Sequence, residues 1–134
     1  MGHYAKKEAQ EAVDREYSAC HAQASLLMKK HRIKKRSFEP QEAFNLCWNI
    51  CDVLGHKKLK KLVLRSPDVS NFAGAHYTKG EIHFPYNYIH TTTLLHELAH
   101  HLCYYGRHGK EFMEMQELVY EAAMNCDKAL LTKE

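Results

Sequence analysis

A chain of 134 residues, 45% hydrophobic and 26% charged, with a net charge of +3, has the composition of one soluble globular domain. It is long enough for a single hydrophobic core and too short for two. No apolar run approaches the 18 or so residues that span a bilayer, and no signal peptide opens the chain, so we expect a cytoplasmic protein without membrane contact. Five scattered cysteines predict small buried thiols that stay reduced.

Residues 1–56 are predicted to be a helical N-terminal part. The segment Ala5–Lys30 has no glycine or proline and carries an apolar stripe at helical spacing. That stripe consists of Ala9, Val13, Tyr17, Cys20, Ala24 and Leu27. Pro40 suits a first helical turn and Gly55 a helix end, so we predict a second helix over Pro40–Leu54. Its inward side chains are expected to be Phe44, Cys47, Trp48 and Cys51.

Residues 60–131 are predicted to form the core that carries the functional site. Leu62-Val63-Leu64 within Lys60–Arg65 indicates a buried strand, and two short segments joined through Gly80 indicate a β-hairpin. The hairpin strands are Gly74–Tyr77 and Glu81–Phe84, stopped by Pro85. Two helices follow, Tyr88–Tyr105, ended by Gly106, and Gly109–Leu131, which should bury Phe112, Met115, Val119, Ala123 and Cys126. We therefore predict one α+β domain over residues 1–134, with a small antiparallel sheet packed on helices.

The most informative stretch is His96-Glu97-Leu98-Ala99-His100, which has the pattern HExxH. On a helix, residues four apart share one face, so two imidazoles can bind one metal ion while Glu97 reaches a water on that ion. With 11 histidines in the chain, about 0.08 such matches are expected by chance. The helical wheel adds support, because an apolar arc lies opposite the histidine arc. The apolar arc contains Leu94, Leu95, Leu98, Leu102 and Tyr105.

With His108-Gly109-Lys110-Glu111-Phe112 following, the stretch resembles the SprT/Spartan-type zinc metallopeptidases, whose signature is HExxH and then HG-x-x-aromatic. The resemblance extends at most over Val63–Tyr120 and is sharp over Leu94–Phe112. Two features depart from that family: the short spacing between His100 and His108, and the absence of a zinc ribbon. The spacing is closer to the related WLM-type peptidases. The resemblance implies a zincin-like fold with HExxH on the active-site helix.

Together, the motif and the resemblance predict a zinc-dependent peptidase. His96, His100 and His108 would hold Zn²⁺, and Glu97 would be the general base. The hairpin before this helix would bind extended protein or peptide substrate by main-chain pairing. Candidates for stabilising the oxyanion are Tyr86, Tyr104 and Arg107, and candidates for extra ligands are His76 and His83.

The third metal ligand is open to an alternative. Metzincin spacing is excluded, because Gly106 stands where its histidine would be. A gluzincin-type site would instead take a carboxylate from the last helix. The carboxylates within reach are Glu114, Glu117 and Glu121. We favour His108, because it sits at a turn beside Gly109 and fits the family signature.

Charge is unevenly spread along the chain, with +7 in residues 1–67 and −4 in residues 68–134. Two basic clusters, Lys29–Arg36 and Lys57–Lys61, could contact phosphates nonspecifically, or could be solvated surface. With the SprT resemblance, these clusters suggest proteolysis of DNA-associated proteins. Two other functions remain open: hydrolysis of a non-peptide amide, and metal binding without catalysis in a nucleic-acid-associated accessory protein. The presence of Glu97 argues against the second, because a structural zinc site does not need it.

Overall fold

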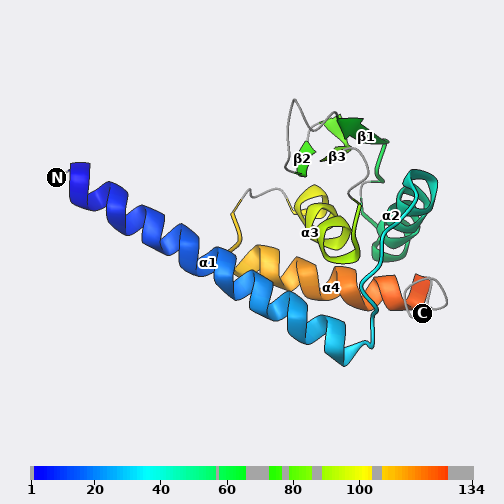
Figure 1. The fold of residues 1–134 in the computed structure, drawn as a ribbon, viewed down its shortest axis with the longest axis horizontal. Coiled ribbons are helices and arrows are strands. Elements are labelled where there is room, and N and C mark those ends of the chain that lie inside the picture. Colours follow the sequence, from blue (N-terminus) through cyan, green and yellow to red (C-terminus); the bar gives the residue numbers. More distant parts are fainter. Residues whose placement is uncertain are drawn as a thin grey trace.

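A computed structural model of the chain describes residues 2–56, 58–65, 73–76, 79–85, 89–103 and 107–126. Within these ranges the fold is α+β, and its elements follow the predicted order (Figure 1). They are α1 (Gly2–Lys30), α2 (Pro40–Leu54), β1 (Lys61–Arg65), β2 (Gly74–His76), β3 (Glu81–Pro85), α3 (Thr91–Leu102) and α4 (Lys110–Cys126). None of the described helices is long and apolar enough to cross a membrane.

The three described strands form a mixed sheet in the order β1-β3-β2. The predicted hairpin is confirmed, because β2 pairs with β3 antiparallel, with Ala75 opposite Ile82. The expected purely antiparallel sheet is wrong, because β1 pairs with β3 in parallel, with Leu62 opposite Ile82. Parallel neighbours need a long connection, and residues 66–80 provide it.

The sheet lies over α3, with α2 beside it, and α4 and α1 lie on the far side of α3 (Figure 1). Ile82 and Phe84 are buried and join the helices in one hydrophobic cluster. The predicted burial of β1 is wrong, because Leu62 and Val63 are only half-buried and Leu64 is exposed. As an edge strand beside β3, β1 has less cover than the central strand.

The second helix has the predicted bounds, and local chemistry explains both. At its start the Glu39 and Glu42 side chains form a reciprocal capping box ahead of Pro40. At its end Gly55 adopts a left-handed conformation, φ 67°, and its N–H bonds to backbone carbonyls of the last turn. Phe44 is half-buried and Trp48 is exposed at 38%, so the predicted inward face is correct for the two cysteines, and Trp48 lies outside it.

The first helix is only half covered. Cys20, Ala24 and Leu27 are buried as predicted, whereas Val13 and Tyr17 are exposed, and Figure 1 shows this helix continuing beyond the rest of the fold at its N-terminal end. Its 29 residues span about 43 Å, and α4 with 17 residues spans about 25 Å. Among the described residues, α1 extends beyond the rest of the fold at its N-terminal end, which explains why the predicted stripe is buried only from Cys20 onward (Figure 1).

The metal-motif helix is shorter than predicted. It begins at Thr91, whose hydroxyl accepts a hydrogen bond from the Arg36 N–H at 3.0 Å and whose own N–H donates to the Arg36 carbonyl at 3.1 Å. It ends at Leu102, where the Cys103 N–H donates to the His100 carbonyl. The predicted stop at Gly106 lies outside the described residues, as do residues 127–131 of the predicted last helix. All five cysteines are free thiols, and all are buried except Cys126, which is half-buried.

Candidate metal centre

The apolar arc of α3 anchors this helix in the core and turns HExxH toward α1 and α4. Leu94, Leu95 and Leu98 have no exposed surface, whereas His96 and His100 are half-buried. Glu97 is 9% exposed, and burial raises the pKa of its carboxyl from 4.5 to about 7. The helical wheel therefore predicted the anchoring face correctly, and it placed the two histidines together on the other side.

His108 completes a group of three imidazoles. Its Nε2 atom lies 3.2 Å from Nε2 of His96 and 3.0 Å from Nε2 of His100. The Phe112 ring packs against all three, with ring centroids 5.0, 4.4 and 5.0 Å from those of His96, His100 and His108. Phe112 is the third residue of α4, so the start of this helix packs an aromatic ring on all three imidazoles.

Hydrogen bonds alone cannot satisfy this arrangement. Each ring nitrogen carries either one N–H or one lone pair, so the His108 Nε2 atom cannot serve both neighbours well. A single cation among the rings would accept a lone pair from each imidazole. Zn–N bonds of about 2.0–2.1 Å in tetrahedral geometry place ligand nitrogens about 3.3 Å apart, close to the two spacings found here. The two Nε2 spacings to His108 are therefore compatible with ligands of one zinc ion.

The electrostatics of the group point the same way. The pKa of His96 is lowered from 6.5 to about 3, mainly by burial and to a smaller extent by the charges of His100 and His108. Burial and then the charge of His108 lower the pKa of His100 to about 4, and burial also lowers the pKa of His108. All three imidazoles are therefore neutral at physiological pH, which is the form that binds a metal.

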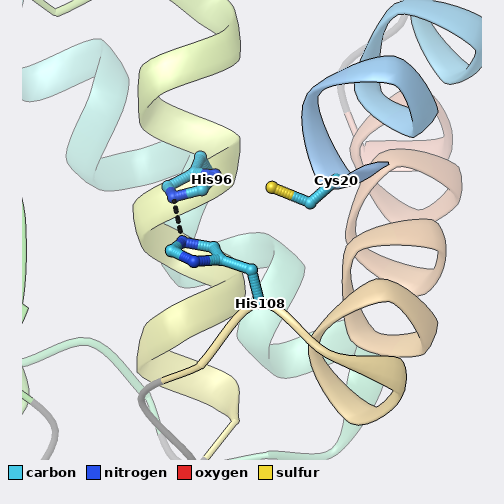
Figure 2. Close-up of side chains that lie close together, drawn as sticks. All are labelled: Cys20, His96 and His108. Atoms are coloured by element: carbon cyan, nitrogen blue, oxygen red, sulfur yellow. Dashed lines mark hydrogen bonds between the residues drawn. The ribbon is translucent and has the colours of Figure 1, made fainter. Parts of the chain in front are cut away.

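One turn of α1 lies against the same imidazoles. The Tyr17 ring meets the His108 ring edge-on at 5.2 Å, and the His21 ring stacks on the His96 ring at 5.8 Å. Between them, the Cys20 sulfur points from α1 toward the two rings (Figure 2). The ligand atoms of Cys20, His96 and His108 all lie within 4.8 Å of one another. Sequence reasoning missed this contribution, because Tyr17 and Cys20 belonged to an apolar stripe that predicts core.

The turn that carries His108 is held by a carboxylate of α1. Glu16 accepts hydrogen bonds from the Arg107 guanidinium at 3.0 and 2.8 Å. A Cβ atom on Gly109 would lie 3.1 Å from a Glu16 oxygen, so the absent side chain permits this close approach. Arg107, a candidate for stabilising an oxyanion, is therefore engaged in an ion pair with α1.

The remaining candidates lie elsewhere. Glu114, Glu117 and Glu121 are exposed on α4, and the first two line a groove of about 540 Å³ between α1 and α4 that His108 also borders. His83 bonds to Arg65 and Glu81 on the sheet. Three further candidates, Tyr86, Tyr104 and the side chain of His76, fall outside the part of the chain that is described. His108 thus contacts both HExxH histidines, at 3.2 and 3.0 Å, whereas the three carboxylates are exposed on α4.

Comparisons of the chain with protein-family models, curated proteins and solved structures gave no match. The function proposed next therefore depends on the residues and their geometry.

Proposed function

We propose that this protein is a zinc-dependent peptidase, with the ion held by His96, His100 and His108 and with Glu97 as general base. The observation that carries the proposal is the convergence of the three Nε2 atoms, with spacings of 3.2 and 3.0 Å to His108. A zinc ion held by three histidines supplies a water whose pKa is near 7 and polarises a carbonyl.

The chain's own residues would do the rest of the chemistry. Burial raises the pKa of Glu97 to about 7. A general base is most effective when its pKa is close to the pH at which the enzyme works. Glu97 would take the proton of the attacking water and pass it to the leaving amine. Phe112, packed on the imidazoles, would hold the rings in position and exclude bulk water from them.

A peptide is the favoured substrate because of the sheet. In the described part of the chain β2 is an edge strand, and it packs against α3. An extended peptide could pair its main chain with this edge and pass near the metal helix. Hydrolysis of a non-peptide amide would use the same metal residues and no such edge. A zincin-like fold is accordingly part of the proposal.

The test combines zinc analysis with one conservative variant. We expect one zinc per chain and hydrolysis of an unfolded protein substrate by the wild type. Glu97→Gln should keep zinc and fold and reduce turnover by about 10²–10⁴, because glutamine cannot act as a base at neutral pH. Glu111→Gln, an exposed carboxylate at the start of α4, is the matched control. Unchanged hydrolysis by Glu97→Gln would remove Glu97 from catalysis.

We further propose that the Lys29–Arg36 cluster contacts nucleic acid nonspecifically and brings the peptidase to DNA-associated proteins. Five basic residues at the end of α1 and just after it are exposed, namely Lys29, Lys30, Arg32, Lys34 and Lys35. In the Lys57–Lys61 cluster, Lys58 pairs with Asp52 and lies over the Trp48 ring. The two clusters flank α2 in the sequence.

Salt dependence tests this second proposal. Binding to duplex DNA should weaken with salt with a slope near −0.9 per phosphate contact. Changing the five exposed residues of the first cluster to glutamine should abolish binding, and Lys60→Gln with Lys61→Gln should reduce it less. Binding that is absent at low salt, or unaffected by the five changes, would show that this cluster is only solvated surface.

A further inference from the structure

A cysteine on α1 lies beside the proposed metal centre and has no part in the mechanism above. Cys20 has no exposed surface, and its sulfur lies within 4.8 Å of the ligand atoms of both His96 and His108 (Figure 2). Thiolate sulfur is a preferred zinc ligand, with Zn–S bonds of about 2.3 Å. We propose that Cys20 is a fourth protein ligand that closes the metal centre in the resting protein. This inference rests on the metal site of the proposed function.

The distances leave a short movement for the sulfur. In tetrahedral coordination a sulfur and a nitrogen ligand lie about 3.5 Å apart, so the sulfur must approach the His96 and His108 imidazoles by at most about 1.3 Å. The Cys20 thiol now donates a hydrogen bond to the Tyr17 carbonyl, one turn back, at 3.1 Å. A rotation about the Cα–Cβ bond would exchange this bond for one to the ion. On binding, the S–H bond breaks, the proton passes to solvent, the sulfur lone pair forms the new bond and one water leaves.

Burial raises the pKa of the Cys20 thiol to about 11, so a bound cation would be needed to make the thiolate. The Tyr120 hydroxyl on α4 is buried and has no hydrogen-bond partner among the described residues, and burial, followed by Cys20, raises its pKa. A thiolate at Cys20 would give this buried O–H an acceptor. The Gln116 amide, fully buried, donates to the Cys20 carbonyl at 3.0 Å and holds α1 in place at this residue.

Closure by Cys20 has a consequence for activity. A zinc site with four protein ligands has no position left for water, whereas hydrolysis needs one open. The wild type would therefore hydrolyse peptides slowly, with turnover confined to molecules in which Cys20 has withdrawn from the ion and recovered a proton. His21 and Tyr17, which lie on the His96 and His108 rings, would move with the same turn of α1.

Cobalt(II) substitution in the full chain tests the inference independently of activity. We expect the wild type to show visible d–d absorption of tetrahedral cobalt together with thiolate-to-cobalt charge transfer in the near ultraviolet. Cys20→Ala should keep the d–d bands and lose the charge-transfer band. Cys126→Ala, a half-buried thiol at the end of α4, should keep both. Cys20→Ser serves where alanine impairs folding, because a serine hydroxyl gives no such band.

Zinc affinity and turnover give a second measurement. Cys20→Ala should weaken zinc binding at least tenfold, because loss of even a residue that only hydrogen-bonds to a ligand weakens metal binding by about 10- to 100-fold. The same variant should raise peptide hydrolysis. Tetrahedral cobalt in the wild type without a charge-transfer band would overturn the role of Cys20 and leave the three-histidine site intact. Failure of the wild type to bind cobalt or zinc would overturn the metal site itself, and the role of Cys20 with it.

Discussion

Two groups of histidine in this protein differ in what their ring nitrogens contact. On the sheet, His83 Nδ1 accepts a hydrogen bond from the Arg65 guanidinium at 2.7 Å, and its Nε2 lies 2.9 Å from a Glu81 carboxylate oxygen. A guanidinium donor and a carboxylate acceptor thus satisfy the two ring nitrogens. The hydrogen bond to His83 lowers the pKa of Glu81. At α3, by contrast, the Nε2 atoms of His96 and His100 both face the Nε2 atom of His108.

His83 and the three imidazoles at α3 thus differ in their hydrogen bonding. Protein groups satisfy the His83 ring, because one nitrogen accepts and the other can donate. The three imidazoles at α3 are half-buried and directed at one another through their nitrogens, an arrangement that a shared cation would stabilise. Histidine content and burial do not distinguish the two cases, because all four rings are half-buried.

The largest expected difference between the two groups of histidine is in the effect of their alanine variants on zinc binding. His96→Ala, His100→Ala or His108→Ala should each weaken zinc binding by orders of magnitude, because each removes one of three ligands. His83→Ala should leave zinc affinity unchanged. A competition titration with a chromophoric chelator measures both. Retention of tight zinc binding in the three variants would contradict the site.

The same titration decides the third ligand. Glu117→Ala and Glu121→Ala should bind zinc nearly as the wild type does, because these carboxylates are exposed on α4. A loss of zinc in either variant, with affinity kept in His108→Ala, would favour a gluzincin-type ligand set and remove the link to the SprT signature.

A smaller effect should appear in the pH dependence of the metal-free protein. His96 and His100 have folded-state pKa values of about 3 and 4, below the ordinary 6.5, so below pH 6.5 the unfolded chain binds more protons at these sites. The free energy of unfolding should therefore fall as the pH drops below 6.5. Each net proton corresponds to about 1.4 kcal/mol per pH unit.

Glu97 opposes this trend over part of the range. Its pKa is raised from 4.5 to about 7, so between these values the folded state holds the extra proton and acidification is stabilising. Two histidines outweigh one glutamate, and below pH 4.5 the opposition ends. Urea unfolding in the presence of a chelator should thus show a fall of about one net proton from pH 6.5 downward, which ends as folded His100 and His96 become protonated near pH 4 and 3. Glu97→Gln should show a steeper fall between pH 6.5 and 4.5, and stability that is constant or rising on acidification would contradict the prediction.

The smallest effect should come from the contacts that orient the histidine side chains. Hydrogen bonds to Arg65 and Glu81 orient the His83 ring directly. The turn that carries His108 is instead held by the ion pair between Glu16 of α1 and Arg107. Such pairs contribute about 0–1 kcal/mol, so Glu16→Ala should weaken zinc binding by no more than about fivefold. Glu81→Gln, the matching change beside His83, should not alter it. Isothermal titration with zinc compares them, and an equal loss in both variants would exclude a specific role for the Glu16 contact.

Local patterns predicted the parts of the fold that depend on local interactions. The bounds of α2 follow from Pro40 and Gly55, and the shared face of the two HExxH histidines follows from helical periodicity. The pairing partner of β1 could not be predicted, because an isolated apolar strand contains no information on whether its neighbour runs parallel or antiparallel. The uncovered half of α1 could not be predicted either, because an apolar stripe does not show where its partner helix ends.

The part of the candidate site that was missed depends on contacts between the two ends of the chain. Cys20 and Tyr17 fit a stripe that suggests core packing, and only the tertiary structure places them beside His108. His21, next to Cys20, was the one available signal, since a histidine directly beside an apolar stripe is well placed to reach a site at the helix interface. His108, in contrast, was a candidate from the sequence, because it sits beside Gly109 at a turn and fits the HG-x-x-aromatic signature.

The packing of α1 on α4 also constrains how the protein is assembled. The Gln116 amide reaches the Cys20 carbonyl across 96 residues of chain, and the Gln23 amide reaches the Met113 carbonyl across 90. Contacts of such high contact order form late, because the long loop must close before they contribute free energy. On the ribosome, α1 is synthesised first and must wait for α4 to emerge. The contacts that hold α1 beside His96 and His108 would therefore form only after α4 has been translated, and until then the exposed apolar stripe of α1 would be a natural binding site for chaperones.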